Sequence, residues 1–458
     1  MSDLPEASVT PGEKDLWFLP LGGCGEIGMN MSLYGHNQQW LMVDCGMSFE
    51  RQEHSLRPKL VAADPSFIAE RKSALAGIVL THAHEDHIGA LPVLWKQFPA
   101  PVYATPFTAE VLRRKAAGRG GQIPRSIIEC VPGETTQIGP FTIEWLAVTH
   151  STADCAALCI RCPAGSVLHT ADWKCDSDPI IGQAFDSAPF RKAGRAGLDA
   201  VVCDSTNAAV PGRSVSEGAV LSEWRKVIKR CEGRVVVACF SSNVARMRSL
   251  ALVAEHTQRY FGLLGRSLDT IHSAALATGL LPRSERLIQS AHLGYLPKHE
   301  VLALATGTQG EVGSALHKLA AANHPQLDLE EGDTLIYSAR IIPGNEETIA
   351  RVFQRLRERG VHIIDSSQEV VHASGHPCRD ELVDMYQWLK PRLAIPVHGE
   401  ELHLRANAEL ARGSGARMVL TGRNGDLFYL APEPGMRRKV ASIGRIELDE
   451  RQETKALP

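Results

Sequence analysis

Short apolar runs separated by polar turns cover the first third of the chain and predict β-strands. The clearest of these runs between Leu16 and Thr170 are Trp17–Leu21, Met31–Tyr34, Trp40–Asp44, Ala76–Leu80 and Phe141–Val148. Their length and their content of β-branched and aromatic residues are typical of buried strands. A helix is expected around Phe107–Ala117, and apolar residues at helical spacing predict another helix that begins near His87 or Gly89.

The pattern changes between Asn207 and Gln368, where apolar strands alternate with amphipathic helices. The predicted strands are Val235–Ala238, Leu335–Ser338 and Val361–Ile364, and the predicted helices are Val220–Ile228, Val244–Ala254 and Ile349–Leu356. Such alternation is typical of βαβ units around a parallel sheet. A helix at Leu382–Leu389 and a strand at Leu393–Val397 follow. The sequence therefore predicts an α/β protein with more than one domain.

Histidine and aspartate residues gather where predicted strands end. The densest group is the loop after Leu80, which holds His82, His84, Asp86 and His87. Residues two apart in extended chain project the same way, and imidazole and carboxylate groups are the ligands that Zn²⁺ prefers. We therefore predict a metal site. Three more candidate ligands follow other strands in the same way: His150, Asp172 and His398.

Composition places the chain among ordinary globular proteins. Its 458 residues carry a net charge of −3, and 44% of them are hydrophobic. No apolar run approaches the roughly 18 residues of a membrane span, and the N-terminus lacks a signal pattern, so we expect a cytoplasmic protein. The eleven cysteines are expected to be packed thiols. The spacing of Cys155, Cys159 and Cys162 fits no standard zinc motif.

The middle of the chain is locally basic. Between Asn207 and Glu300 there are thirteen Lys and Arg residues against seven Asp and Glu. A solvated charged surface explains such an excess. Attraction of a polyanion toward this part of the molecule explains it equally well. The sequence alone does not choose between the two.

The candidate ligands and many stretches around them resemble one family in order and in type. The ligands resemble those of the metallo-β-lactamase superfamily, and the whole pattern is similar to its β-CASP branch and to the ribonuclease J family within it. The matching stretches are Leu21–Asn30, Val43–Gly46, His169–Lys174, Asp204–Asn207, Ser241–Asn243, Thr306–Glu311, Ile342–Glu346, His372–His376 and Pro396–Glu400.

The resemblance implies an αββα metallo-β-lactamase sandwich with an inserted β-CASP α/β domain, a parallel sheet flanked by helices. We expect residues 16–206 and 374–447 to form the sandwich, residues 207–373 the β-CASP domain, and residues 1–15 and 448–458 short tails. It also implies two zinc ions, with Mn²⁺ or Mg²⁺ as possible substitutes. By this resemblance His82, His84 and His150 hold one ion, Asp86, His87 and His398 hold the other, and Asp172 bridges both.

The activity implied by the resemblance is hydrolysis of RNA, mainly from a 5′-monophosphate end in the 5′→3′ direction, with endonuclease activity possible. The implied catalytic residues are Asp86, His376 and Asp204. A pocket for the terminal phosphate is implied at Ser242, Arg266, Ser338, His372, Ser374 and His376. Two alternatives stay open: a β-CASP nuclease that acts on DNA, and a catalytically weak partner subunit that binds RNA.

Two departures from the family pattern affect these expectations. Ribonuclease J chains usually continue into a small C-terminal domain that contributes to assembly, whereas this sequence ends 60 residues after His398. A homodimer is therefore possible but doubtful. Ala171 stands where the family commonly has glycine, which affects the freedom of the backbone and not the ligands.

Overall fold

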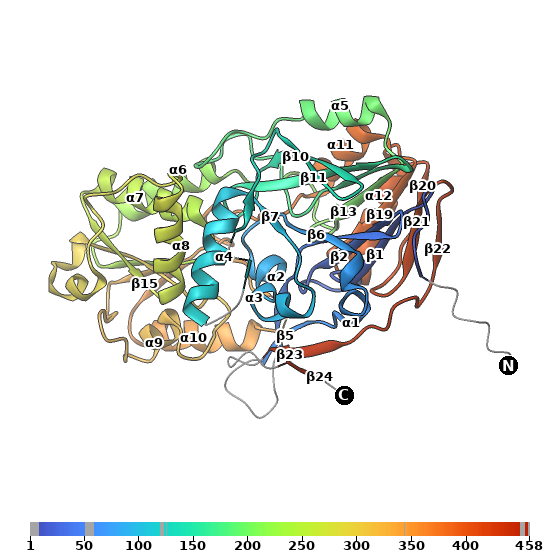
Figure 1. Cartoon of the computed structure of the whole chain (residues 1–458). Helices are drawn as coiled ribbons and strands as arrows, with labels where there is room; N and C mark the ends of the chain where they lie inside the picture. The colour runs from blue at the N-terminus through green and yellow to red at the C-terminus, as the bar shows by residue number, and fades with distance from the viewer. Residues whose placement is uncertain are drawn as a thin grey trace.

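Two mixed β-sheets packed face to face form the larger of two lobes (Figure 1). The computed structural model describes residues 9–50, 59–119, 123–124, 126–342, 344–448 and 454–456. The first sheet has the order β22-β21-β1-β2-β3-β6-β7-β8 and the second the order β20-β19-β13-β12-β11-β10-β9. The strands of the first are β1 (Leu16–Gly22), β2 (Met31–His36), β3 (Gln39–Val43), β6 (Leu75–Leu80), β7 (Val102–Ala104), β8 (Ile128–Glu129), β21 (Leu427–Ala431) and β22 (Gly435–Arg437). Those of the second are β9 (Thr135–Ile138), β10 (Phe141–Val148), β11 (Cys155–Cys162), β12 (Gly165–His169), β13 (Ala200–Asp204), β19 (Leu393–Val397) and β20 (Met418–Val419).

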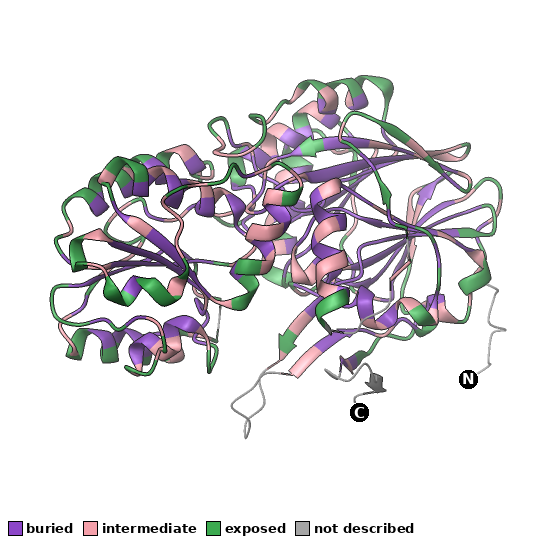
Figure 2. Cartoon of the chain, turned by 60° about the vertical axis from the view of Figure 1, so that its left-hand side comes forward, coloured by how far each residue is buried: buried purple, intermediate pink, exposed green. Residues whose placement is uncertain are grey.

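Both faces of each sheet are buried, which explains why these strands read as continuous apolar runs. In β1, Leu16 and Phe18 pack between the sheets against Trp145, whereas Trp17 and Leu19 face the helices outside. The first sheet is covered by α1 (Ser66–Ala69), α2 (Glu85–Ile88), α3 (Leu91–Leu94) and α4 (Pro106–Arg119). The second is covered by α5 (Ala188–Ala196), α11 (Arg379–Leu389) and α12 (Glu401–Gly413). The predicted αββα sandwich is confirmed, and Figure 2 shows its buried sheets.

A five-stranded parallel sheet forms the smaller lobe, at the left of Figure 1. Its order is β15-β16-β14-β17-β18. The strands are β14 (Val235–Ala238), β15 (Tyr260–Leu264), β16 (Val301–Ala305), β17 (Thr334–Tyr337) and β18 (His362–Ile364). One face packs on α6 (Glu217–Lys229), α7 (Val244–Thr257) and α8 (Arg266–Ala277), and the other on α9 (Ala315–Ala320) and α10 (Glu346–Glu358). The predicted parallel α/β unit is therefore confirmed.

The smaller lobe lies in the sequence between two strands that are neighbours in space. Strands β13 and β19 pair in parallel, with Asp204 opposite Val397, yet all five strands of the smaller lobe come between them in the chain. This is the topology of an inserted domain. The exact domain bounds stay a prediction.

A small antiparallel sheet with the order β24-β23-β5-β4 pairs two strands that follow β3 in the chain with the last two strands described. It contains β4 (Met47–Glu50), β5 (Lys59–Ala63), β23 (Arg445–Leu448) and β24 (Thr454–Ala456). Part of the segment expected to be a C-terminal tail is thus a strand, because β24 pairs with β23. Residues 1–8 of the expected N-terminal tail lie outside the described residues.

The helix predicted near His87 or Gly89 differs from the structure. Helix α2 already begins at Glu85, and a separate helix α3 follows it. The reason for the break is the Ala90 N–H, which donates to the Cys45 carbonyl at 3.1 Å rather than continuing the helix. Short 3₁₀ turns lie at Lys72–Ala74, Trp95–Gln97, Ser290–Tyr295 and Lys298–Glu300.

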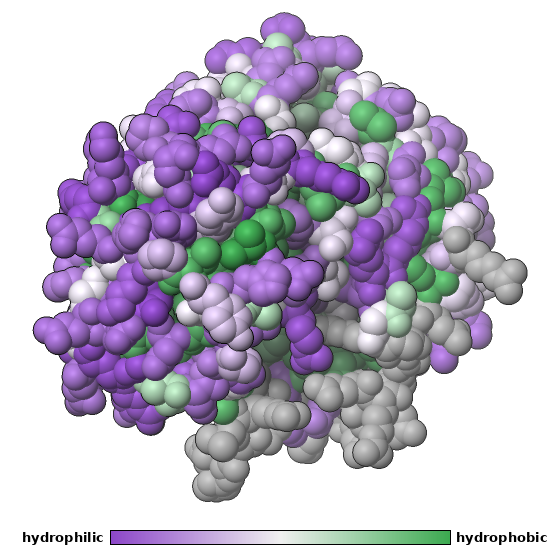
Figure 3. All heavy atoms as spheres, turned by 90° about the vertical axis from the view of Figure 1, so that its left-hand side faces the viewer, coloured by the Kyte–Doolittle hydropathy of each residue, from purple (hydrophilic) through white to green (hydrophobic). Residues whose placement is uncertain are grey.

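The surface of the smaller lobe that faces the viewer in Figure 3 is mainly hydrophilic, with a narrow band of hydrophobic side chains among the polar ones. Within the described ranges, no helix has both the length and the hydropathy that a membrane span needs.

Candidate active site

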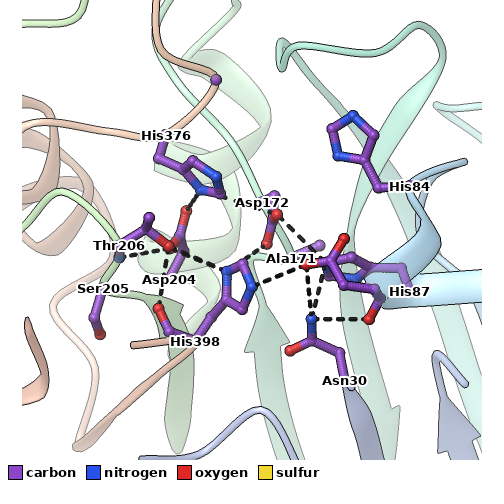
Figure 4. A network of polar contacts seen from close by, with 12 residues as sticks. Asn30, His84, His87, Ala171, Asp172, Asp204, Ser205, Thr206, His376 and His398 are labelled. Atoms are coloured by element: carbon purple, nitrogen blue, oxygen red, sulfur yellow. Dashed lines mark hydrogen bonds and ion pairs between the residues drawn. The ribbon is translucent and has the colours of Figure 1, made fainter. Parts of the chain in front are cut away.

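All seven candidate metal ligands meet at one rim of the larger lobe. The segment that carries His82, His84, Asp86 and His87 follows β6 of the first sheet, with Asp86 and His87 in helix α2. His150, Asp172 and His398 follow β10, β12 and β19 of the second sheet. Neighbouring parallel strands end at the same edge, so the side chains after them converge, as Figure 4 shows for Asp172, Asp204 and His398.

Three of the ligands and Asp172 form one compact donor set. His84 Nδ1 lies 3.2 Å from His82 Nε2 and 3.1 Å from His150 Nε2. Asp172 Oδ2 lies 3.6 Å from His150 Nε2 and 3.8 Å from His82 Nε2. Four ligands around Zn²⁺ at about 2.0–2.1 Å in a tetrahedron would be about 3.3 Å apart. The observed spacings fit a divalent cation at this position.

A second donor set shares Asp172 with the first. His87 Nε2 lies 3.3 Å from Asp172 Oδ2 and 3.6 Å from Asp86 Oδ2. His398 Nε2 lies 3.3 Å from Asp86 Oδ2, and His398 Nδ1 lies 3.1 Å from Asp172 Oδ1. The carboxylate of Asp172 therefore stands between the two sets, as a bridging ligand must. The two donor sets contain the residues that the family resemblance implied for each ion, and the number and identity of the ions stay a prediction.

Hydrogen bonds to the far ring nitrogens fix the orientation of three of these histidines. His87 Nδ1 donates to Asp44 Oδ2 at 2.7 Å, and His150 Nδ1 donates to the Gly375 carbonyl at 2.6 Å. Thr81 Oγ1 donates to Asp44, so it accepts from His82 Nδ1 at 3.0 Å. Such partners hold a ring in place and select the tautomer that presents the other nitrogen to a metal.

Burial and mutual charge set the protonation of the two donor sets. Burial, and then neighbouring histidines, lower the pKa of His82 and of His150, and burial lowers that of His84 to about 4. Burial opposes ionisation of Asp172, but His398 and His87 outweigh it and hold the pKa of Asp172 well below its usual range. In the first set, neutral imidazoles around an ionised carboxylate are the forms that bind a cation. In the second set burial opposes protonation, but Asp172 and neighbouring carboxylates outweigh it and raise the pKa of His87 and of His398, so a cation that bound there would release their protons.

His376 and Asp204 form a pair beside the donor sets. His376 Nδ1 donates to Asp204 Oδ2 at 2.8 Å and lies 3.9 Å from Asp172 Oδ2. Burial alone would lower the pKa of His376, but Asp204 and Asp172 outweigh it and raise that pKa above the ordinary value. Asp204 is itself held by the Thr206 backbone N–H at 2.9 Å and the Thr206 hydroxyl at 2.7 Å.

A cavity of about 2660 Å³ lies over these groups and extends between the lobes. The residues expected to bind a terminal phosphate all line it: Ser242, Arg266, Ser338, His372, Ser374 and His376. These side chains differ in how accessible they are to a ligand in the cavity. Arg266 is exposed at the start of α8. Ser338 is 2% exposed, and its hydroxyl donates to the Val371 carbonyl at 2.7 Å.

Three further polar residues belong to the site and carried no prediction. Asn207 Nδ2 donates to Ser374 Oγ at 2.8 Å, and Asn207 Oδ1 accepts from Arg340 Nη1 at 2.7 Å. Asn30 Nδ2 donates to the Asp86 carbonyl at 3.0 Å. Asn30 and Asn207 each end a stretch that resembles the family, which was the only signal for them, and Arg340 had none.

Comparisons of the sequence with family models and of the fold with solved structures both find similar proteins. Three family models match: the metallo-beta-lactamase superfamily over residues 25–178, the beta-CASP domain of ribonuclease J over residues 232–356, and a Zn-dependent metallo-hydrolase RNA specificity domain over residues 360–420. The crystal structure of a protein of unknown function from Enterococcus faecalis V583 superposes on this chain with a TM-score of 0.65 and a sequence identity of 16%. The match covers 91% of this chain and 100% of the other and shows a shared fold.

Three curated relatives cover nearly the whole chain, and each bears the name Ribonuclease J. The protein from Sinorhizobium meliloti is 44% identical over 95% of this chain and 78% of its own length. The protein from Mycolicibacterium smegmatis is 38% identical over 97% and 80%, and the protein from Thermus thermophilus is 35% identical over 94% and 76%. The chain belongs to the ribonuclease J family.

Proposed function

We propose that this chain is a two-zinc ribonuclease that removes nucleotides from the 5′-monophosphate end of single-stranded RNA, with some endonuclease activity, in RNA decay or maturation. Family membership makes it a metal-dependent ribonuclease. The observation that carries the two-metal mechanism is the position of Asp172 Oδ2, 3.3 Å from His87 Nε2 in one donor set and 3.6 Å from His150 Nε2 in the other.

Different residues of the chain would orient the attacking water and supply a proton to the leaving oxygen. Two bound cations would supply an acidified water as nucleophile and positive charge for the phosphate oxygens. Asp86 Oδ2, 3.3 Å from His398 Nε2, would orient that water as well as ligate. His376, whose pKa is raised by Asp204 and Asp172 against the effect of burial, holds a proton near neutral pH and would give it to the departing 3′ oxygen.

The terminal phosphate would bind where the cavity meets the segment from His372 to His376. Ser374 lies there with Asn207, which also accepts from the exposed guanidinium of Arg340. A hydroxyl and a fixed cation suit a phosphate dianion, because charge-assisted hydrogen bonds are the strong ones. Binding of the terminal phosphate at this position would place the bond next to the 5′ end at the metal centre, so that cleavage would proceed from that end.

The test uses one end-labelled RNA prepared with a 5′-hydroxyl, a 5′-monophosphate or a 5′-triphosphate. We expect the monophosphate form to be degraded fastest, with mononucleotides as the first products. Asp86→Ala should abolish the activity and His376→Ala should lower it about 10²- to 10⁴-fold, to a rate that can still be measured, while the unfolding transitions of both variants remain cooperative. Equal rates on all three ends contradict the end-recognition proposal. Faster hydrolysis of a matched DNA, or two bound ions with no turnover of any oligonucleotide, favours one of the two alternatives.

A further inference from the structure

The segment Val371–His376 carries much of the candidate site but belongs to no helix or strand. It presents His376 to Asp204, and the Gly375 carbonyl to His150. The buried backbone groups of a segment without ladder hydrogen bonds need other partners, and side chains from elsewhere supply several of them here. At its downstream end this is done by Asn207, which donates to Ser374 Oγ at 2.8 Å and to the His376 carbonyl at 3.3 Å.

At the upstream end two side chains contact the segment. Trp224 Nε1 donates to the Val371 carbonyl at 3.2 Å, and Arg246 of α7, a residue with no accessible surface, makes the larger set of contacts. Its Nη2 donates to the Ala373 carbonyl at 3.3 Å and its Nη1 to the Val371 carbonyl at 3.5 Å. Nη1 also donates to the Ser338 hydroxyl, which in turn donates to the Val371 carbonyl. One planar guanidinium thus holds two peptide groups of the segment and a residue of the proposed phosphate pocket.

The guanidinium is itself fixed by a buried carboxylate. Arg246 Nε lies 2.6 Å from Glu217 Oε2, and Nη2 lies 3.2 Å from Oε1, a two-pronged contact between groups that are 0% and 2% exposed. A buried charge pair of this kind adds little to the free energy of unfolding, but removal of one partner lowers that free energy strongly. Its geometry, in contrast, is well defined, because the fork matches the carboxylate at two points.

A second buried pair continues the network toward the metal ligands. The Glu217 backbone N–H donates to Asp176 Oδ2 at 3.0 Å, and Lys174 Nζ lies 2.8 Å from the same oxygen. Lys174 is fully buried and lies two residues after Asp172. The two ion pairs therefore link the chain beyond the bridging carboxylate to the segment that carries His376.

We propose that Arg246, held by Glu217, is a positioning residue that sets the Val371–His376 segment and thereby the place of His376 over the two donor sets. This inference rests on the proposed function, because its effect is on the proton that His376 supplies. Lysine cannot replace the guanidinium, since a single ammonium group cannot reach Glu217, Ser338 and two carbonyls from one plane.

The test is a double-mutant cycle on the full chain with two bound metal ions, followed by single-turnover hydrolysis of 5′-monophosphorylated RNA. Arg246→Lys should lower the rate about 10- to 100-fold, since small misplacements of catalytic groups have effects of that size. In a His376→Ala background the same change should lower the rate less than about threefold, because residues that act as a unit are not additive.

The matched control is Arg259→Lys. Arg259 is 3% exposed in the same lobe and donates to the carbonyls of Gly233, Val301 and Cys231, away from the site. It should change the rate less than about threefold in either background. If Arg246→Lys loses cooperative unfolding, Glu217→Gln replaces it in the same cycle with the same expectation.

The outcomes separate the inference from the function. Equal losses from Arg246→Lys in both backgrounds show a general structural effect and overturn the inference, as does a rate within threefold of the parent. A parent protein that hydrolyses no RNA contradicts the proposed function and the inference with it. An active parent whose Arg246→Lys variant is fully active contradicts the inference alone.

Discussion

Gly46 offers a way to disturb the metal centre without touching a ligand. It follows Asp44 and Cys45 at the end of β3, and its Cα lies against the backbone of the ligand loop. A Cβ added there would stand 1.7 Å from the Asp86 carbonyl oxygen, 2.1 Å from its carbon and 2.7 Å from the His87 nitrogen. Real Cβ contacts essentially never fall below 3.0 Å. Gly46→Ala therefore requires a shift of at least about 1.3 Å, the difference between 3.0 and 1.7 Å.

Two hydrogen bonds hold the backbone at Asp86 and His87 against that shift. The Asp86 carbonyl accepts from the Asn30 N–H at 2.9 Å, and the His87 carbonyl accepts from the Cys45 N–H at 2.7 Å. Metal–ligand distances tolerate about 0.2 Å, so Asp86 and His87 would leave bonding range. We expect the RNA rate to fall about 100-fold or more, and overpacking to lower the free energy of unfolding by about 1–3 kcal/mol.

The assay combines metal content by mass spectrometry with single-turnover RNA hydrolysis. Gly413→Ala is the neutral control, because nothing lies within 4 Å of its added Cβ. Gly77→Ala is the control for strain, because its Cβ would meet the side chains of Ile138 at 2.7 Å and Tyr103 at 3.0 Å in the core. Two bound ions and a rate within threefold of the parent in Gly46→Ala would refute the reasoning.

Three further outcomes are expected. Asp44→Asn removes the charged acceptor 2.7 Å from His87 Nδ1 and should weaken metal binding about 10- to 100-fold in a chelator competition titration; unchanged affinity would contradict the role given to Asp44. Ala171 has φ +51°, so Ala171→Gly should raise the free energy of unfolding by about 1 kcal/mol in a denaturant titration, and a loss of stability would count against this explanation. Removal of metal by a chelator should abolish RNA hydrolysis, and Zn²⁺ or Mn²⁺ should restore it; activity in protein shown by mass spectrometry to be metal-free would rule out the two-metal mechanism.

The positions of the ligands could be predicted because the information is local. Each candidate ligand lies within a few residues after an apolar run, and these runs form strands that end at one rim. Asp44, which holds His87 Nδ1, likewise comes directly after a strand, β3. The family resemblance added the division into two donor sets.

The remaining parts of the site depend on contacts between distant segments. Asn207 and Arg340 are 133 residues apart, and nothing near either residue shows that they meet. The break after Gly89 depends on a hydrogen bond from Ala90 to Cys45, on a different strand end. No local pattern encodes such a partner.

The local excess of basic residues is a further case in which the sequence alone does not show the contacts. A count of charges does not separate buried or paired side chains from exposed ones. Arg246 and Arg259 are inside the smaller lobe, where they bind oxygens of the protein itself. Arg230 pairs with Glu369, and Arg234 pairs with Glu330 and Asp333. Part of the excess charge is therefore structural, which a net count over residues 207–300 cannot reveal.

Anomalous diffraction at the zinc edge, from crystals of the protein loaded with zinc, shows whether Asp172 bridges two cations. We expect two peaks per chain, about 3.5–4 Å apart, with a carboxylate oxygen of Asp172 in bonding range of both. A single peak at this rim, or two peaks of which only one contacts Asp172, would contradict this expectation.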